Sequence, residues 1–568
     1  MIGFDLKNLD TKAFMIFLVI MAFFTVFLFY PMAYVFESAF VVQGKFTLVF
    51  FELLFTDRFL TEALRNSLII GVTTTASTAA FSLPLAFLCV RYGFPGKSWL
   101  QGLLLVPLVM PPFVGAIGLK QVFARYGSLN LLLIDLHLMN PANPVDWFGG
   151  GFWGIITIEV LNLFPIMYLS IAAALANVDP SLEEAAESLG AKGATLFRKI
   201  TFPLTFPGFF AGAIIVFIWA FTDLGTPLIF DFSKTIPAQI FSMTQDIETN
   251  PMGYVLTIVT LLVSVLALLS VKRYVGLRSY EMMGRGQHVG KRETDLKGWK
   301  AAAASTFLIL IVLLALIPQI SVILTSLAGQ WFQTILPTQY TTQYFETLVT
   351  HPVAGPSIVN SLFYSGLSTI IDISLGFIIA YMLARRRFPG RDILDSVAMM
   401  PFAIPGVVIA FGYLAAFSRT PLNAFINPVP LLVISYAVRR LPYTLRAAYA
   451  GFQQTSVYLE EAAMNLGASP IRTMRAITLP LIMANVVAGG VLAFSGAMME
   501  VSDSLILAPQ DQYFPMTKAI YALNLRLTDG AYVASALGVV GIIVVATCFF
   551  IANRLLGRSM GELFRAGG

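Results

Sequence analysis

Charged side chains inside long apolar stretches are the residues of this sequence best suited to chemistry. Arg439 and Arg440 lie side by side in one such stretch, and Asp223 and Glu500 follow two others. In a membrane span, an ionisable group costs about 2.5 to 3.5 kcal/mol at the bilayer centre, so it needs a partner or a water-filled cavity. The chemistry that such groups suit is the passage of an ion or a polar solute.

Two interpretations of these charges stay open. The arginines can extend to the inner interface or pair with carboxylates such as Glu159, or one of them can line a route and meet an anionic solute or its counter-ion. Asp223 and Glu500 can guard that route or its outer mouth, or they can be packing residues bonded to nearby hydroxyls. Asp503 follows Glu500 by three residues and belongs to the same candidate set.

Residues for covalent, redox or metal chemistry are few and scattered. Cys89 and Cys548 lie in apolar runs without C-x-x-C spacing, and the three histidines stand in separate loops. A Gly-Lys-Ser tripeptide begins at Gly96, but Arg91 stands where a phosphate-binding loop needs its first glycine, so we interpret the tripeptide as a turn before a span. We therefore expect no catalytic site, no metal centre, no bound cofactor and no ATPase site in this chain.

Membrane spans are the elements that must position the charges. The sequence is 57% hydrophobic and 12% charged, with a mean hydropathy of +0.79, whereas soluble domains carry about 25% charged residues. A span needs about 20 apolar residues. Candidate stretches begin near residues 13, 66, 98, 151, 207, 254, 301, 358, 393, 428, 484 and 532. Because the two-residue alternation of a barrel is absent, we expect an all-α integral membrane protein with about twelve transmembrane helices.

The basic residues predict how the spans are oriented. With both termini in the cytoplasm, 24 of the 36 lysines and arginines lie on the inner side and 9 on the outer side. The net charge of +5 therefore needs no nucleic acid to explain it. We expect a multi-pass membrane protein that has lipid as its surroundings.

The sequence contains an internal repeat. Residues 183–204 and 460–481 align at a constant offset of 277, while upstream markers such as Asn66 and Asn360 align at an offset of 294. The difference of 17 residues indicates an insertion in the first half, which we place in the outer stretch 126–151.

The repeat predicts two lobes. We expect a first lobe in residues 1–275, a basic cytoplasmic linker in 276–300 and a second lobe in 301–568. Each lobe holds about six spans in the same topology, so a pseudo-twofold axis should run along the membrane normal, with a pathway between the lobes.

The repeated segments lie in cytoplasmic loops, 177–206 and 451–483, and each should form two short helices around a glycine turn. Ser181 and Glu184 fit a capping box, and Gly190 can adopt the left-handed geometry that ends a helix. The second helix should begin at Ser469-Pro470 in the second copy and close at a Leu-Pro or Phe-Pro step in both. One such loop would be an ordinary solvated turn, but a matched pair suits a symmetric dimeric partner.

At these loops the sequence resembles the binding-protein-dependent permeases of ABC importers. Their hallmark is E-A-A-x-x-x-G, followed about nine residues later by I-x-L-P, and both copies match it except for Phe202 in place of leucine. The loop residues concerned are Glu183, Glu184, Ala185, Ala186, Gly190 and Pro203 in the first copy, and Glu460, Glu461, Ala462, Ala463, Gly467 and Pro480 in the second.

The resemblance implies a place in the bacterial inner membrane, partners and a cargo. It makes the two loops coupling helices that dock on two copies of a cytoplasmic ABC ATPase, which uses ATP and Mg, while a periplasmic binding protein delivers the solute. Fused two-lobe permeases look most like the ferric-iron and thiamine branch, which includes phosphonate and sugar-phosphate importers. The stretch that begins at Asp223 is similar to an Asp-Phe-Gly-Thr pattern of iron-type members, whereas the stretch at Glu500 differs from their Lys-Glu-Leu-Pro-type pattern.

We therefore hypothesise that the cargo is ferric iron, and a phosphonate or another organophosphate is the alternative cargo. The alternative from another class is an ion-coupled secondary transporter, which would need no ATPase and would give Glu184 and Glu461 no special role. A membrane-embedded enzyme is the weakest alternative, because no nucleophile–base or metal-ligand spacing stands out.

Overall fold

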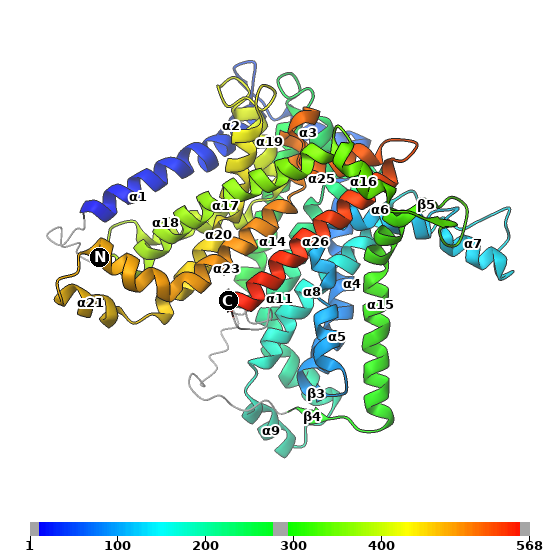
Figure 1. The fold of residues 1–568 in the computed structure, drawn as a ribbon, viewed down its shortest axis with the longest axis horizontal. Coiled ribbons are helices and arrows are strands. Elements are labelled where there is room, and N and C mark those ends of the chain that lie inside the picture. Colours follow the sequence, from blue (N-terminus) through cyan, green and yellow to red (C-terminus); the bar gives the residue numbers. More distant parts are fainter. Residues whose placement is uncertain (1–10, 277–292, 557–568) are drawn as a thin grey trace.

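The computed structural model describes residues 11–276 and 293–556, and helices form nearly all of its regular structure (Figure 1). The strands of this part of the chain form only short two-stranded pairs. These pairs are β1 (Val41–Val42) with β2 (Lys45–Phe46), β3 (Tyr92–Gly93) with β4 (Thr294–Asp295), and β5 (Ala328–Gln330) with β6 (Gln339–Tyr340). The all-α prediction is confirmed.

Nine helices of the described residues are long and apolar enough to cross a membrane, and two bent helix pairs raise the number of such spans to eleven. Helix α20 (Val429–Gln454) has the length of a span but carries three arginines. It follows the second bent pair as α8 (Phe152–Ala176) follows the first. With α20 included, the spans agree with the expected number of about twelve, six in each lobe.

The spans of the first lobe are α1 (Thr11–Phe24) continued by a π-helical turn (Thr25–Phe29) and α2 (Tyr30–Phe40), α4 (Arg58–Arg91), the bent pair of α5 (Lys97–Leu103) and α6 (Pro112–Phe123), α8, α11 (Phe202–Thr222) and α14 (Met252–Gly276). Those of the second lobe are α15 (Trp299–Leu327), α17 (Ala354–Arg385), the bent pair of α18 (Arg391–Ala403) and α19 (Gly406–Ala416), α20, α23 (Leu479–Met498) and α26 (Gly530–Leu556). Short helices are α3 (Val49–Thr56), α7 (Ser128–Asp135), α9 (Pro180–Ser188), α10 (Ala194–Leu196), α12 (Gly225–Ile229), α13 (Ile236–Ser242), α16 (Gln343–Thr350), α21 (Val457–Asn465), α22 (Pro470–Thr473), α24 (Ser502–Leu507) and α25 (Met516–Asn524).

Each lobe bends its third span at a proline. The angles are 98° in the first lobe, at Pro111 and Pro112, and 101° in the second, at Pro405. Proline lacks the N–H that a continuing helix needs, and it also disfavours helical geometry in the residue before it. The spans that the sequence predicts from residues 98 and 393 are therefore two half-spans each.

The lobes repeat the same contacts. Ser67 in α4 accepts a hydrogen bond of 2.9 Å from the amide of Ile236, and Ser361 in α17 accepts one of 2.7 Å from the amide of Met516. These serines are 294 residues apart, so the short helices α13 and α25 are held in the same way. The contacts follow the relation between the lobes that the internal repeat predicts.

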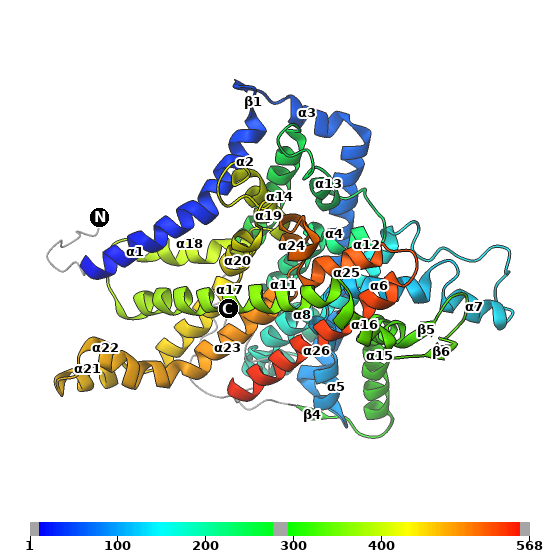
Figure 2. The ribbon, with the colours of Figure 1, turned by 45° about the horizontal axis from the view of Figure 1, so that its top comes forward.

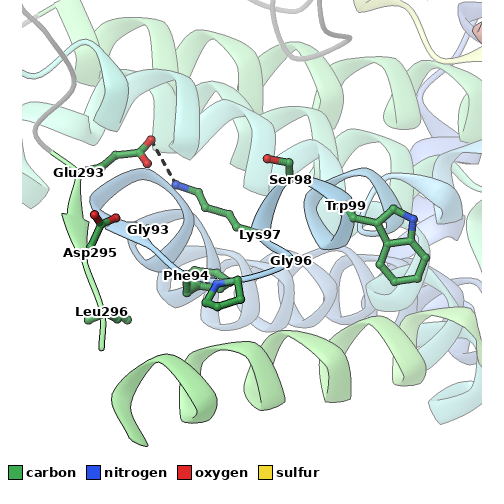
Figure 3. A pocket seen from close by; sticks show the side chains of 10 residues that line it. Gly93, Phe94, Gly96, Lys97, Ser98, Trp99, Glu293, Asp295 and Leu296 are labelled. Atoms are coloured by element: carbon green, nitrogen blue, oxygen red, sulfur yellow. Dashed lines mark ion pairs between the residues drawn. The ribbon is translucent and has the colours of Figure 1, made fainter. Parts of the chain in front are cut away.

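Two segments depart from the symmetry. The insertion expected in 126–151 includes α7, which projects beside the β5–β6 hairpin in both views (Figures 1 and 2). The proposed linker 276–300 lies partly outside the described residues, but its end is tied to the first lobe by the parallel pair β3–β4 and by the ion pair of Lys97 with Glu293 at 3.3 Å (Figure 3). The proposed lobe boundaries at 275 and 301 remain predictions.

Candidate functional site

The two repeated loops have the turn geometry that the sequence predicts. Gly190 and Gly467 end α9 and α21 with φ angles of 92° and 89°, in the left-handed region that favours glycine. Ser469 caps α22 and Pro470 takes its first turn, as expected. The first loop is capped differently, because Asp179 rather than Ser181 begins α9. Asp179 accepts the amide hydrogen of Ser181, which lowers the pKa of Asp179.

The prediction that the second helix of each loop closes at a proline is wrong. Pro203 and Pro480 stand in the first turns of α11 and α23, where proline is tolerated because the first N–H groups of a helix have no internal partner. A π-helical turn precedes each of them, at Phe197–Thr201 and Met474–Thr478. Each loop therefore runs without interruption into the span that follows it.

An ion pair holds each loop against the end of the second span of its lobe. Arg91 Nη2 lies 2.6 Å from Glu183 Oε1, and Arg385 Nε lies 3.1 Å from Glu460 Oε1. All four side chains are 9 to 16% exposed. The sequence analysis missed the two arginines, although each is the last residue of its span and the two are 294 residues apart.

The neighbouring carboxylates face outward. Glu184 and Glu461 are exposed, whereas Glu183 and Glu460 turn toward the arginines. Leu189 and Leu466, beside the glycine turns, are each 90% exposed, and the sequence analysis missed this matched apolar pair as well. The outer surface of each loop thus presents a carboxylate and a leucine at equivalent positions.

Removal of the loop arginines gives a first prediction. We expect Arg91→Ala with Arg385→Ala to lower uptake by roughly tenfold. Each substitution leaves a largely buried glutamate without its charged partner, at a cost of about 1 to 3 kcal/mol, and loosens the loop. Membrane abundance measured beside uptake checks this. Arg386→Ala is the control, since this neighbouring arginine donates to the Tyr381 hydroxyl. Equal uptake by the double variant and the control would contradict the assigned role.

The fifth span of each lobe is broken at the level where the lobes meet. Helix α11 ends at Thr222 before α12, and α23 ends at Met498 before α24. A Cβ atom at Gly225 would lie 2.9 Å from Cγ1 of Val501 and 2.8 Å from Cβ of Phe113. Only glycine allows this approach, so the two breaks touch in this structure. Interrupted helices at a repeat interface are typical of transport sites.

The break in the second lobe holds a network of charges. Glu500 forms ion pairs with both Arg439 and Arg440, and Asp503 lies 3.4 Å from Arg439 Nη1. Ser435 donates a hydrogen bond of 2.9 Å to the second carboxylate, Asp503. Glu500 is 5% exposed, and the arginine side chains are 17% and 16% exposed. The partners of the arginines are therefore Glu500 and Asp503, and not Glu159 as the sequence analysis suggested.

The first lobe has a different chemistry at the same positions. Glu159 accepts a hydrogen bond of 3.2 Å from the Thr226 hydroxyl, and Asp223 accepts one of 2.8 Å from the Thr226 amide. Asn162, which is equivalent to Arg439, donates to the carbonyl oxygens of Pro107 and Met110 at 2.9 and 2.8 Å. It thereby satisfies carbonyl groups that the bent span exposes. The bonds to Asp223 and Glu159 fit the packing interpretation.

The structure shows how the possible metal ligands and the Gly-Lys-Ser tripeptide are arranged. Within 11–276 and 293–556, no group of three or more His, Cys, Asp or Glu side chains is placed to hold a metal ion. The Gly-Lys-Ser tripeptide is the turn that begins α5, with Gly96 at a φ of 76°, and Lys97 turns toward Glu293 (Figure 3). The interpretation of this tripeptide as a turn before a span is confirmed.

Comparisons with known proteins agree on one family. The family described as binding-protein-dependent transport system inner membrane component matches residues 78–276 and 372–562. The ferric transport system permease protein FbpB of Actinobacillus pleuropneumoniae is 27% identical, over 94% of this chain and 76% of that protein. A putative ferric transport system permease protein, FbpB 1 of Haemophilus influenzae, is 28% identical, over 85% of this chain and 76% of that protein. The molybdenum transport system permease protein ModB of Escherichia coli is 30% identical, over 40% of this chain and 99% of that protein.

Proposed function

Because this chain belongs to the family of binding-protein-dependent transport system inner membrane components, we propose that it carries ferric iron across the bacterial inner membrane. It is the permease subunit of an ABC importer, and the family match covers both halves of the chain. In the proposed cycle, a periplasmic binding protein delivers the iron, and two copies of a separate ATPase consume ATP with Mg. The proposed docking of the ATPase depends on a single observation, the matched pair of loops.

The loops support docking of a dimeric ATPase for three reasons. They lie at equivalent places in the two lobes, they present Glu184, Leu189, Glu461 and Leu466 outward, and they run directly into the broken spans. Movement of a docked partner would therefore pass to the breaks through rigid helix. In the proposed orientation, these loops and both chain termini lie in the cytoplasm. Phe17 in α1 supports this, because it packs on Phe388 in the loop that follows Arg385.

The charges at the breaks favour a cation over an oxyanion. Glu159, Asp223, Glu500 and Asp503 supply four carboxyl groups, against the two arginines of the network. Both arginines are already paired with Glu500, so an anionic cargo would have to displace a buried carboxylate. The relatives named for ferric transport also align over both lobes, whereas the molybdenum permease aligns over 40% of the chain.

Uptake by intact cells tests the cargo. We expect cells that carry this chain with its ATPase and binding protein to accumulate labelled ferric iron, and a ferric chelator in the medium to reduce the initial rate at least roughly tenfold. An excess of a phosphonate or of molybdate should leave the rate unchanged. A cell line whose ATPase cannot hydrolyse ATP is the control. Competition by a phosphonate, with no response to the chelator, would contradict the assignment and favour an organophosphate cargo.

A further inference from the structure

Asp372, in the middle of α17, is a buried carboxylate that the proposed function does not use. It is 1% exposed, and neither carboxylate oxygen has a hydrogen-bond partner in the described part of the chain. Native proteins rarely leave such a group unpartnered, and in a membrane the cost is high. The equivalent residue of the first lobe, 294 positions earlier, is Thr78, whose hydroxyl bonds to the carbonyl oxygen of Thr74.

Helix α20 brings Arg440 close to this carboxylate. Thr444 donates a hydrogen bond of 2.8 Å to the backbone carbonyl oxygen of Asp372, so α17 and α20 touch here. Arg440 precedes Thr444 by four residues, which places it on the same face of α20, one turn of about 5.4 Å away. Arg440 therefore lies on the side of α20 that packs against α17.

The direction of the helices favours the contact. The end of α17 meets the end of α20, where Arg385 donates to the carbonyl oxygen of Phe452 at 3.0 Å, so the two helices run in parallel. Side chains lean toward the N-terminus of their helix. Asp372 therefore leans toward the level of Arg440, and not away from it.

Arg440 has an unused donor and lies closely against a glycine. Its Nη2 bonds to Glu500, but its Nε has no acceptor in the described structure. Gly496 leaves the space for this arginine, since a Cβ there would lie 3.0 Å from Nε and 3.1 Å from Cδ. The first lobe has Leu163 and Trp219 at the equivalents of Arg440 and Gly496. The second lobe alone thus combines an arginine, a free donor, space and a buried carboxylate.

Gly225 and Val501 bring the two breaks into contact, so a pathway between the lobes requires the breaks to part. Glu500 belongs to the moving break, whereas Arg440 and Asp372 lie on helices that are bonded to each other. We propose that Asp372 is the second partner of Arg440: when the break moves, the guanidinium passes from Glu500 to Asp372. The arginine then stays paired in both conformations, each of which is stabilised by one carboxylate. This inference rests on the proposed function in one respect, since it requires the break to move during transport.

A double-mutant cycle on the purified full-length chain tests the second partner without cargo or ATPase. The variants are Asp372→Asn, Glu500→Gln and the double variant, and the measurement is the midpoint of thermal unfolding in detergent. Both substitutions keep the shape of the side chain. Asp372→Asn alone should shift the midpoint little. In the Glu500→Gln background it should lower the midpoint by several degrees more than the sum of the single shifts, because the arginine then depends on Asp372.

Two control measurements accompany the double-mutant cycle. Thr78→Ser, at the matched site of the first lobe, should give additive shifts with Glu500→Gln. In an Arg440→Leu background, the coupling between Asp372 and Glu500 should disappear. Additive shifts for the Asp372 and Glu500 variants, or a double variant more stable than the sum predicts, would overturn the proposal.

An uptake measurement tests whether the exchange occurs during transport. With normal membrane abundance, Asp372→Asn should lower the initial rate of uptake roughly tenfold, the factor that one charge-assisted hydrogen bond corresponds to, whereas Thr78→Ser should not. A normal rate for Asp372→Asn would overturn the exchange. If the wild-type chain takes up no ferric iron, the proposed cargo fails, and the stability cycle alone decides on Asp372.

Discussion

Replacing Glu184 and Glu461 together with lysine should abolish ATP-driven uptake while the permease stays folded in the membrane. Both carboxylates are exposed at equivalent points of the loops, whereas Glu183 and Glu460 hold the loops in place. Reversal therefore changes the docking surface and spares the ion pairs of Glu183 and Glu460. Loss of a charge pair at an interface costs about 2 to 5 kcal/mol, so we expect copurification of the ATPase to fall by roughly a hundredfold or more.

Glu187 supplies the matched control for this experiment. It is exposed on the same helix α9, but its equivalent in the second loop is Met464, so it belongs to no symmetric pair. Glu187→Lys should leave most of the bound ATPase in place. Retention of the ATPase by the Glu184→Lys, Glu461→Lys variant at the control level would show that the loops are not the docking points.

The second large effect is expected at Glu500. Glu500→Ala removes the carboxylate that both arginines share and leaves Arg439 with Asp503 alone. Breaking a buried ion pair from one side costs about 3 to 5 kcal/mol. We therefore expect a much lower midpoint of thermal unfolding and a low abundance in the membrane, measured on the purified chain and by quantitative blotting.

Asp223→Ala, at the equivalent position of the first lobe, provides the comparison. Its carboxylate bonds to the Thr226 amide and forms no ion pair with an arginine among the described residues, so the expected cost is about 1 kcal/mol. Equal losses from Asp223→Ala and Glu500→Ala would contradict the assigned ion network.

The spans and the repeat could be predicted because both depend on the local sequence alone. Twenty apolar residues in a row predict a span in any context, and a constant offset identifies equivalent residues. The offset of 294 also relates Arg91 to Arg385, which form equivalent ion pairs in the two lobes. Gly190 and Gly467 were predictable for a related reason, since the left-handed end of a helix depends on a single residue.

The errors arise where the outcome depends on packing between segments. Pro203 can end one helix or begin the next, and only the geometry of the following span decides. The sequence predicts one span from residue 98 and another from residue 393, but each is bent next to a proline, at Pro111 or Pro405. The sequence leaves the partner of Arg439 open, because its pairing with Glu500 depends on how α23 breaks.

The two lobes share a scaffold and differ in charge. The serine contacts, the loop ion pairs, the π-helical turns and the bent spans occur in both. Arginines at the break and the buried Asp372 occur in the second lobe only. This difference fits a transport cycle in which both lobes move alike and the charged break of the second lobe acts as the gate.

Transport by purified components tests the central claim most directly. The full chain is placed in lipid vesicles with or without the ATPase that copurifies with it, and uptake from the loaded binding protein is followed. We predict uptake only when the ATPase and ATP are both present, and none from the chain alone under a proton or sodium gradient. Gradient-driven uptake by the chain without any ATPase would contradict the account.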